Sequence, residues 1–286
     1  MKQSRRRSSG FLKLASAILQ GRTSRIGVAM IVGLFIFLLG VSFLSPYNSQ
    51  ATTGPENSPP SLSHPFGTTN LGQDVMTQLA RGSYSSLFVG FFAALLASLL
   101  GFLVGILSGY YGRLGVILSA ATDIILTLPN IVVLLIIGSF FNLTNEWMIV
   151  ALAIFLWPSV ARGVRAQVQS LVNRSYVDAA RTSGMSDWQI ILRTLTPKVG
   201  AIGVAYFVFN VALSIVIVTA LQFLGVGNPG TISWGSMLYF AQQYGIYLGD
   251  WWWMLAPGLG ITMFATGFAL VGFSLEEVMN PRLRMK

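Results

Sequence analysis

Long runs of apolar residues alternate with short polar segments along most of this chain. A helix needs about 20 mainly apolar residues to cross the hydrocarbon core of a bilayer. Six stretches reach that length and predict six transmembrane helices, at residues 26–45, 84–111, 115–140, 147–167, 199–222 and 251–275. Arg162 and Arg165 interrupt the fourth stretch after Pro158, so we expect its inner end to project into the cytoplasm.

The apolar runs also suggest two parts of the chain. Residues 1–63 hold a basic N-terminal segment, the first helix and an extracytoplasmic loop rich in Ser, Thr, Pro and Asn. Residues 64–286 hold a core of five helices and a polar loop at 174–197. The first apolar run, from Ile26 to Leu44, is longer than the core of a signal peptide, which favours an uncleaved helix.

Composition supports this interpretation, because 53% of the residues are hydrophobic and only 9% are charged. Soluble domains are roughly a quarter charged. The chain has no cysteine, which excludes disulfides and thiol chemistry. The chain has a net charge of +9, and in a membrane protein such an excess of basic residues is usually located in the cytoplasmic loops. We therefore expect contact with a lipid bilayer and no nucleic-acid partner.

Lysine and arginine set the expected orientation, because cytoplasmic loops of membrane proteins carry an excess of both. With the N-terminus inside, the inner segments hold 17 of the 18 basic residues, and only Arg81 lies outside. The opposite orientation reverses the rule. We therefore expect both termini and the loop 174–197 to be cytoplasmic.

The loop 174–197 predicts two short helices. Its segments 175–178 and 186–189 have the Ser-x-x-Asp and Ser-x-x-Gln forms of a capping box, which marks a helix start. Gly184 lies between them, where a helix C-terminus often needs a residue that tolerates positive φ. A pair of water-facing helices between membrane spans has the form of a docking element.

The second of these helices is amphipathic by its spacing. An apolar stripe at i, i+3, i+4 and i+7 is formed by Trp188, Ile191, Leu192 and Leu195. The pair 196–197, Thr-Pro, suits the N-cap and first position of the following helix, where the missing proline N–H costs nothing.

The order of residues in this loop resembles the signature of ABC importer permeases, Glu-Ala-Ala, three residues, Gly, nine residues, Ile-x-Leu-Pro. The spacing matches, although Asp replaces Glu at 178 and Thr stands at 194 and 196. The resemblance implies a coupling helix that sits in a groove of an ATPase subunit. The implied docking residues are Asp178, Ala179, Ala180, Gly184, Trp188 and Pro197. An ordinary amphipathic loop is the alternative.

Three further segments resemble the C-type permease of dipeptide, oligopeptide and nickel importers. They are His64 to Val75, Ala220 to Gly235 and Asn280 to Leu283. Asn70 and Gln73 depart from the family pattern. For His64, we favour a capping or loop hydrogen bond over a role as ligand or proton switch. The second segment is uncharged and rich in Gly and Pro, and could re-enter the membrane.

Two features lie within the predicted spans. Asp123, followed by Pro129, is the only acid well inside a span, so gating and a structural hydrogen bond remain alternatives for this pair. The second helix carries a small residue at every fourth position, which predicts close packing against another helix. These small residues are Ala93, Ala97, Gly101, Gly105 and Gly109.

Several functions are disfavoured by what the sequence lacks. It has no Gly-x-x-x-x-Gly-Lys-Ser/Thr loop for ATP and no residue cluster with metal-ligand spacing. We therefore expect no enzyme activity, no catalytic residue, and no metal or cofactor in this chain. A secondary transporter, the alternative function, needs ionisable residues or broken helices in two repeated halves, and only Asp123 qualifies.

Taken together, the chain resembles the C-type permease subunit of a dipeptide/oligopeptide-type ABC importer. The resemblance implies an all-α type I importer fold with six transmembrane helices in a bacterial inner membrane. It also implies a homologous permease partner that shares the translocation path, two ATPase subunits that hold ATP and Mg, and an extracytoplasmic solute-binding protein. A dipeptide, an oligopeptide, a nickel complex and glutathione all remain open as substrates.

Overall fold

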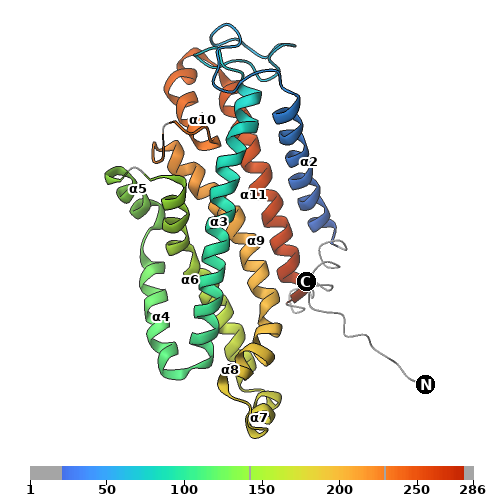
Figure 1. Cartoon of the computed structure of the whole chain (residues 1–286), viewed down its shortest axis with the longest axis vertical. Helices are drawn as coiled ribbons and strands as arrows, with labels where there is room; N and C mark the ends of the chain where they lie inside the picture. Colours follow the sequence, from blue (N-terminus) through green and yellow to red (C-terminus); the bar gives the residue numbers. More distant parts are fainter. Residues whose placement is uncertain (1–20, 142, 229, 280–286) are drawn as a thin grey trace, which may run out of the picture.

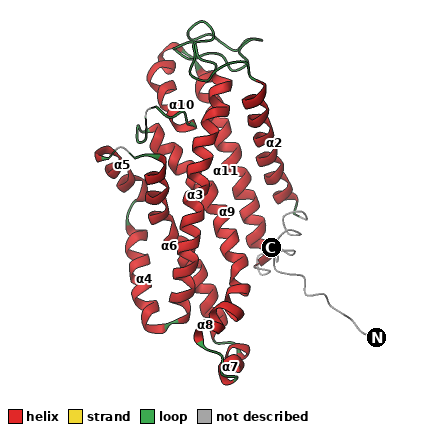
Figure 2. Ribbon diagram, viewed as in Figure 1, coloured by secondary structure: helices red, strands yellow, loops and turns green. Residues whose placement is uncertain are grey.

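The computed structural model describes residues 21–141, 143–228 and 230–279, which form a bundle of helices joined by loops (Figures 1 and 2). No strand occurs among these residues, and the prediction of an all-α protein is confirmed. Five of the helices are long and apolar enough to cross a membrane. One of them, α9, is counted together with the short helices that lead into it. The five helices are α2 (Arg22–Leu44), α3 (Val75–Tyr110), α6 (Asn145–Val172), α9 (Thr196–Phe223) and α11 (Trp251–Met279).

The third predicted helix is broken in the structure. It consists of α4 (Gly112–Thr127) and α5 (Asn130–Phe140), which are bent by 75°. Pro129 disfavours helical backbone at the residue before it, and Leu128 is extended, with φ −78° and ψ 132°. A single helix over 115–140 was therefore wrong. The bent pair counts as the sixth candidate span.

The start of α3 was also misplaced, because α3 begins well before residue 84. Asp74 is its N-cap and accepts a hydrogen bond from the Thr77 backbone N–H at 2.8 Å. The other carboxylate oxygen of Asp74 lies 3.0 Å from Nδ1 of His64, whose ring stacks on Tyr47. The loop hydrogen bond favoured for His64 is therefore confirmed, and it holds the loop 45–74 against the upper end of α3.

The predicted small-residue ridge packs α3 against α6. A Cβ atom at Gly101 would lie 2.5 Å from the carbonyl oxygen of Trp157, and one at Gly105 would lie 2.7 Å from Cβ of Val164. The two backbones approach closely because these positions have no side chain. The packing role predicted for the ridge is confirmed.

The segment between α9 and α11 folds back on the upper end of the bundle (Figure 1). It contains α10 (Trp234–Phe240), the π-helix η2 (Ala241–Gly245) and the short 3₁₀ helix η3 (Ile246–Leu248). Trp234 is fully buried, and its indole Nε1 donates a hydrogen bond to the Leu79 carbonyl at 3.0 Å. This anchor ties α10 to α3.

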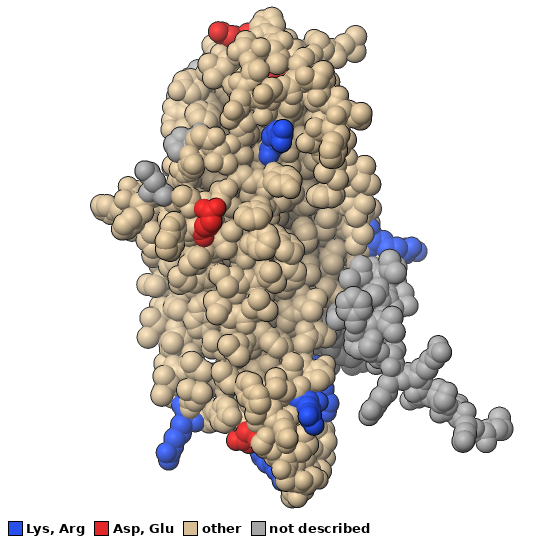
Figure 3. All heavy atoms as spheres, in the orientation of Figure 1, with Lys and Arg blue, Asp and Glu red and all other residues tan. Residues whose placement is uncertain are grey.

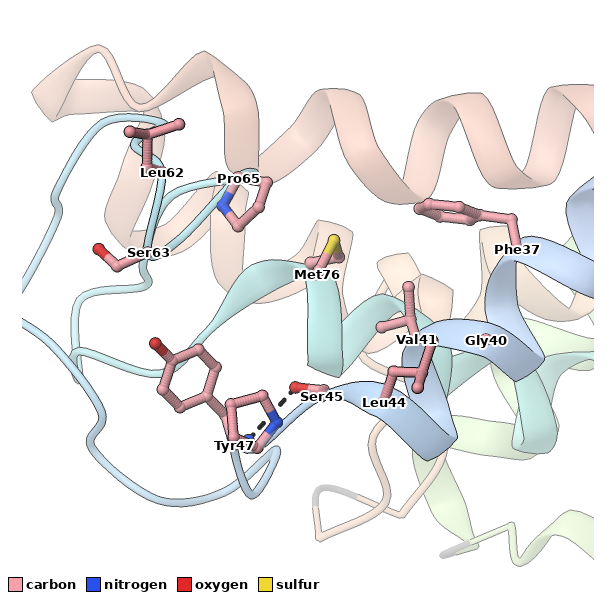
Figure 4. Close-up of a pocket in the computed structure, with 11 residues that line it drawn as sticks. Phe37, Gly40, Val41, Leu44, Ser45, Tyr47, Leu62, Ser63, Pro65 and Met76 are labelled. Carbon is pink, nitrogen blue, oxygen red and sulfur yellow. Dashed lines mark hydrogen bonds between the residues drawn. The ribbon is translucent and has the colours of Figure 1, made fainter.

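A pocket of about 600 Å³ lies between the end of α2, the loop 45–74 and the start of α3 (Figure 4). Phe37, Val41 and Met76 give it an apolar wall, and the Tyr47 backbone N–H donates to Ser45 Oγ at 3.3 Å. The segments that line this pocket lie at the opposite end of the bundle from the loop 174–197 (Figure 1), so the pocket is separate from the predicted docking element.

Candidate functional site

The loop 174–197 projects from the lower end of the bundle (Figure 1). It contains α7 (Ser175–Thr182), the single turn α8 (Asp187–Gln189) and the π-helix η1 (Ile190–Leu195), which leads directly into α9. The predicted helix pair is therefore present. On the face drawn in Figure 3, most Lys and Arg side chains lie on the lower half, including the tip that carries α7.

Gly184 ends α7 in a left-handed turn, with φ +80°. The Met185 N–H donates to the Ala180 carbonyl at 3.1 Å, and the Gly184 N–H donates to the Arg181 carbonyl at 3.0 Å. These two bonds are the pattern of a Schellman C-cap. Apart from its two chain neighbours, no residue has an atom within 4 Å of a Cβ built at Gly184. This glycine is therefore needed for the backbone conformation and not for close packing. The positive φ predicted at this position is confirmed.

Only one of the two predicted capping boxes is present. Ser186 and Gln189 form the reciprocal pair, with the Ser186 N–H donating to Gln189 Oε1 at 3.0 Å. The box at 175–178 was wrong, because α7 starts one residue earlier and Arg174 is its N-cap. Asp178 instead faces Arg181, with 3.7 Å between carboxylate and guanidinium.

The predicted apolar stripe is divided by the π-helix. Ile191 and Leu195 are buried, but Trp188 is 55% exposed and Leu192 is 47% exposed. A π-helix bonds each residue to the fifth one along, which widens the turn and shifts the buried face away from the 3.6-residue register. The prediction that all four side chains share one apolar face was therefore wrong, and two of them face outward.

The start of α9 also differs from the prediction. The Thr196 N–H donates to the Ile191 carbonyl, so Thr196 continues a helix and does not cap a new one. Pro197 nevertheless lies in the first turn of α9, and it supplies no N–H donor there. One helix runs without interruption from Asp187 to Phe223.

A hydrophobic base fixes the loop to the bundle. Val177 of α7 is fully buried in the same core cluster as Ile190, Ile191 and Leu195. Polar contacts add to this base. Tyr110, at the end of α3, donates to Asp187 at 2.5 Å, and the guanidinium of Arg181 lies 5.8 Å from the Tyr110 ring centre. The short helices are therefore held in place while their outer faces stay open.

Most of the predicted docking residues lie on these open outer faces. Asp178, Ala179, Gly184, Trp188 and Pro197 are exposed, and Ala180 is half-buried. Exposed Leu192 was not among the predicted docking residues, although the sequence analysis placed it on the apolar stripe. Tyr110 was also missed, because contact across 77 residues leaves no local signal.

Asp123 and Pro129 lie on another part of the molecule, at α4 and at the break before α5. Asp123 Oδ1 accepts a hydrogen bond from Arg162 Nη2 on α6 at 2.6 Å, and both side chains are more than half exposed. The structural interaction considered for Asp123 is therefore present, as an ion pair that joins α4 to α6. Its role in gating stays a prediction.

Comparison with known proteins relates the chain to a family of transport proteins. The family model described as "Binding-protein-dependent transport system inner membrane component" matches residues 97–285. A Brucella abortus protein, named as a permease of a peptide transport system, is 34% identical over 281 residues, covering 95% of this chain and 92% of that protein. The dipeptide transport system permease protein DppC of Bacillus subtilis is 33% identical over 257 residues, covering 88% and 80%.

A solved structure supports the fold. A chain of the methionine ABC transporter MetNI, in an inward-facing form, aligns with a TM-score of 0.57 at 19% identity, over 74% of this chain and 98% of that chain. The family match spans more than half of the sequence, and it includes α6, the exposed loop and α9. This multi-pass helical chain therefore belongs to the family of binding-protein-dependent transport system inner membrane components.

Proposed function

We propose that this chain is one permease subunit of an ATP-driven importer of peptides or similar small solutes. The names of two relatives, a peptide and a dipeptide transport system permease, support this substrate class. The alternative of a secondary transporter is not favoured, because the matching family works with a binding protein. Members of such permease families are transport subunits and not enzymes.

The proposal includes four kinds of partner. A homologous permease encloses the translocation path together with this chain, and the bilayer surrounds both. Two ATPase subunits hold ATP and Mg, and an extracytoplasmic solute-binding protein delivers the substrate. In this arrangement, residues 64–286 are the permease core, and residues 1–63 add the first helix and an extracytoplasmic loop.

One observation supports the ATPase-docking role of the loop 174–197. The loop exposes Trp188, Leu192 and the Asp178-Ala179 pair, while its apolar base is buried in the bundle. It lies at the end of the bundle where basic side chains gather (Figure 3). Exposed large apolar groups beside polar ones are typical of an interaction surface. A groove in an ATPase subunit would cover them.

The continuous helix from Asp187 to Phe223 suggests how docking is coupled to transport. Its 37 residues span about 55 Å, more than the thickness of a bilayer core. When ATP binding draws the two ATPases together, α7 and α8 would move with them. Because α8 is the first turn of that helix, displacement at the loop would reach the far end of the bundle.

We expect the loop 174–197 and the loop 45–74 to lie on opposite sides of the membrane. In this cysteine-free chain, Glu56→Cys and Thr182→Cys place single thiols at exposed positions in the two loops. A membrane-impermeant thiol reagent applied to intact cells should label residue 56 and leave residue 182 unlabelled until the cells are opened. The reverse pattern would contradict cytoplasmic termini and the six-helix orientation.

The energy source gives a second test of the function. The purified chain alone should hydrolyse no ATP. Together with its partner permease, ATPases and binding protein in liposomes, it should take up solute only when ATP is present on the ATPase side. Uptake by the chain alone, driven by a proton gradient, would instead favour the secondary transporter.

A further inference from the structure

Two pockets lie beside α10. This helix lies at the upper end of the bundle, far from the loop 174–197 (Figure 1). The volumes of the two pockets are about 230 and 460 Å³. Thr231, Ser236 and Phe240 line both pockets and form a common wall. Sites for small ligands usually measure roughly 300–1,000 Å³, so the two pockets together have the size of one such site.

Carboxamide and hydroxyl side chains make up most of the polar lining of both pockets. Asn145, Gln222 and Asn228 line the smaller one. Gln50, Asn70, Gln73 and Gln78 line the larger one. Neither set of lining residues in the described chain contains a charged side chain. Each carboxamide can donate and accept hydrogen bonds, so the surface matches a ligand that does both without a net charge.

Gln222 has an unmet hydrogen-bonding group. This residue lines the smaller pocket and is only 8% exposed, and its Oε1 has no hydrogen-bond partner among the described residues. A buried acceptor without a partner is unfavourable. A change of the side-chain rotamer would bring the whole carboxamide toward the pocket that it lines, where an N–H group of a ligand would satisfy the oxygen.

Hydrogen bonds and close backbone contacts hold the wall around Gln222 in place. Ser233 caps α10 in a reciprocal bond with Ser236, and the Trp234 backbone N–H donates to Ser86 Oγ of α3 at 3.0 Å. Gly235 lies directly against Gln222, and a Cβ at Gly235 would lie 2.6 Å from the Thr219 carbonyl oxygen. A site held in place in this way loses less entropy when a ligand binds.

We propose that these two pockets form a single site for the backbone of a short peptide, with Gln222 as a hydrogen-bond acceptor. The inference rests on the proposed import function. Backbone amides present N–H and C=O groups in every peptide, and neutral carboxamides pair with both whatever the charge of the side chains. Gln222 also lies one residue before the end of the helix that starts in the docking loop, so movement of the loop would alter this site.

Photolabelling tests the site directly. The complete importer in lipid nanodiscs is labelled with benzoylphenylalanyl-alanine, and dialanine is the competitor. We expect label on the 220–245 segment, and Gln222→Leu should weaken dialanine competition about two- to tenfold, the loss of one hydrogen bond. Gln243→Leu is the matched control, because Gln243 is exposed on η2 and lines neither pocket.

The outcomes separate this site from the proposed function. Label elsewhere, or equal competition in wild type and Gln222→Leu, would overturn the site even if ATP-driven uptake of dialanine is normal. Competition by a nickel–histidine complex but not by dialanine would overturn the peptide assignment. Correct labelling without any ATP-driven uptake would leave the site standing and contradict the import function. Co-purification of the ATPases checks that Gln222→Leu is folded.

Discussion

Replacement of Gly184 by valine is expected to reduce ATPase binding and solute uptake strongly, at nearly normal membrane levels. The cause is conformational, because φ at Gly184 is +80° and the surrounding space is open. An L-residue in this region costs about 1–2 kcal/mol, which lowers the fraction of loops in the docking shape about 5- to 30-fold. Co-purification of the ATPase subunits and ATP-driven uptake in liposomes measure the effect.

Gly184→Asn is the matched control for this variant. Asparagine is larger than glycine, yet it tolerates the left-handed conformation. It should therefore keep most of the ATPase binding that valine loses. Normal binding and uptake by Gly184→Val would mean that residues 174–197 are a linker, and the docking assignment would lose its main support. An equal loss of ATPase binding in both variants would indicate that the ATPase contacts the loop at Gly184, and that the backbone conformation there is not the cause.

Replacement of Gly105 by valine is expected to lower the membrane level of the whole chain severalfold. A Cβ at this position would lie 2.7 Å from Cβ of Val164 and 2.8 Å from the Ala161 carbonyl, so α3 and α6 would have to separate. Overpacking of this kind costs about 1–3 kcal/mol, a large share of a total stability of about 5–15 kcal/mol. Immunoblots of membrane fractions and thermal unfolding in detergent measure the loss.

Gly258→Val controls for the intrinsic helix preference of valine. Gly258 lies inside α11, and no atom outside its own stretch of helix approaches within 4 Å of a Cβ built there. This variant should accumulate and unfold like the wild type. A similar loss of membrane level and thermal stability in both variants would show that valine itself weakens these helices. The close approach of α3 and α6 would then not explain the effect of Gly105→Val.

The candidate docking site shows which parts of a loop can be predicted locally. The turn at Gly184 and the capping box at Ser186 were correct, because both depend on a few neighbouring residues and their backbone conformations. The stripe at 188–195 was wrong, because it assumed a regular helical period. Nothing in the local pattern specifies the π-helix that joins α8 to α9 and contains buried Ile190.

The break at Pro129 could be predicted in part from the sequence. Proline and its preceding residue make an interruption predictable, and the sequence has this signal at Thr127-Leu128-Pro129. The bend of 75° depends on how α4 packs against α3 and α6, with Gly115 against the Ser108 backbone and Asp123 paired with Arg162. These contacts are not visible in the local pattern.

By itself, the sequence determined the membrane class, the approximate spans, the exposed helix pair and the small-residue ridge. Each of these depends on the composition or spacing of residues within one segment, since partition into a bilayer and backbone preference are local properties. Only the tertiary structure decided which distant groups meet. The Tyr110–Asp187 bond joins residues 77 apart, and the pockets at α10 draw on positions from 50 to 253. Such contacts depend on how the helices cross, because a helix fixes the direction of its own side chains but not the neighbour they reach.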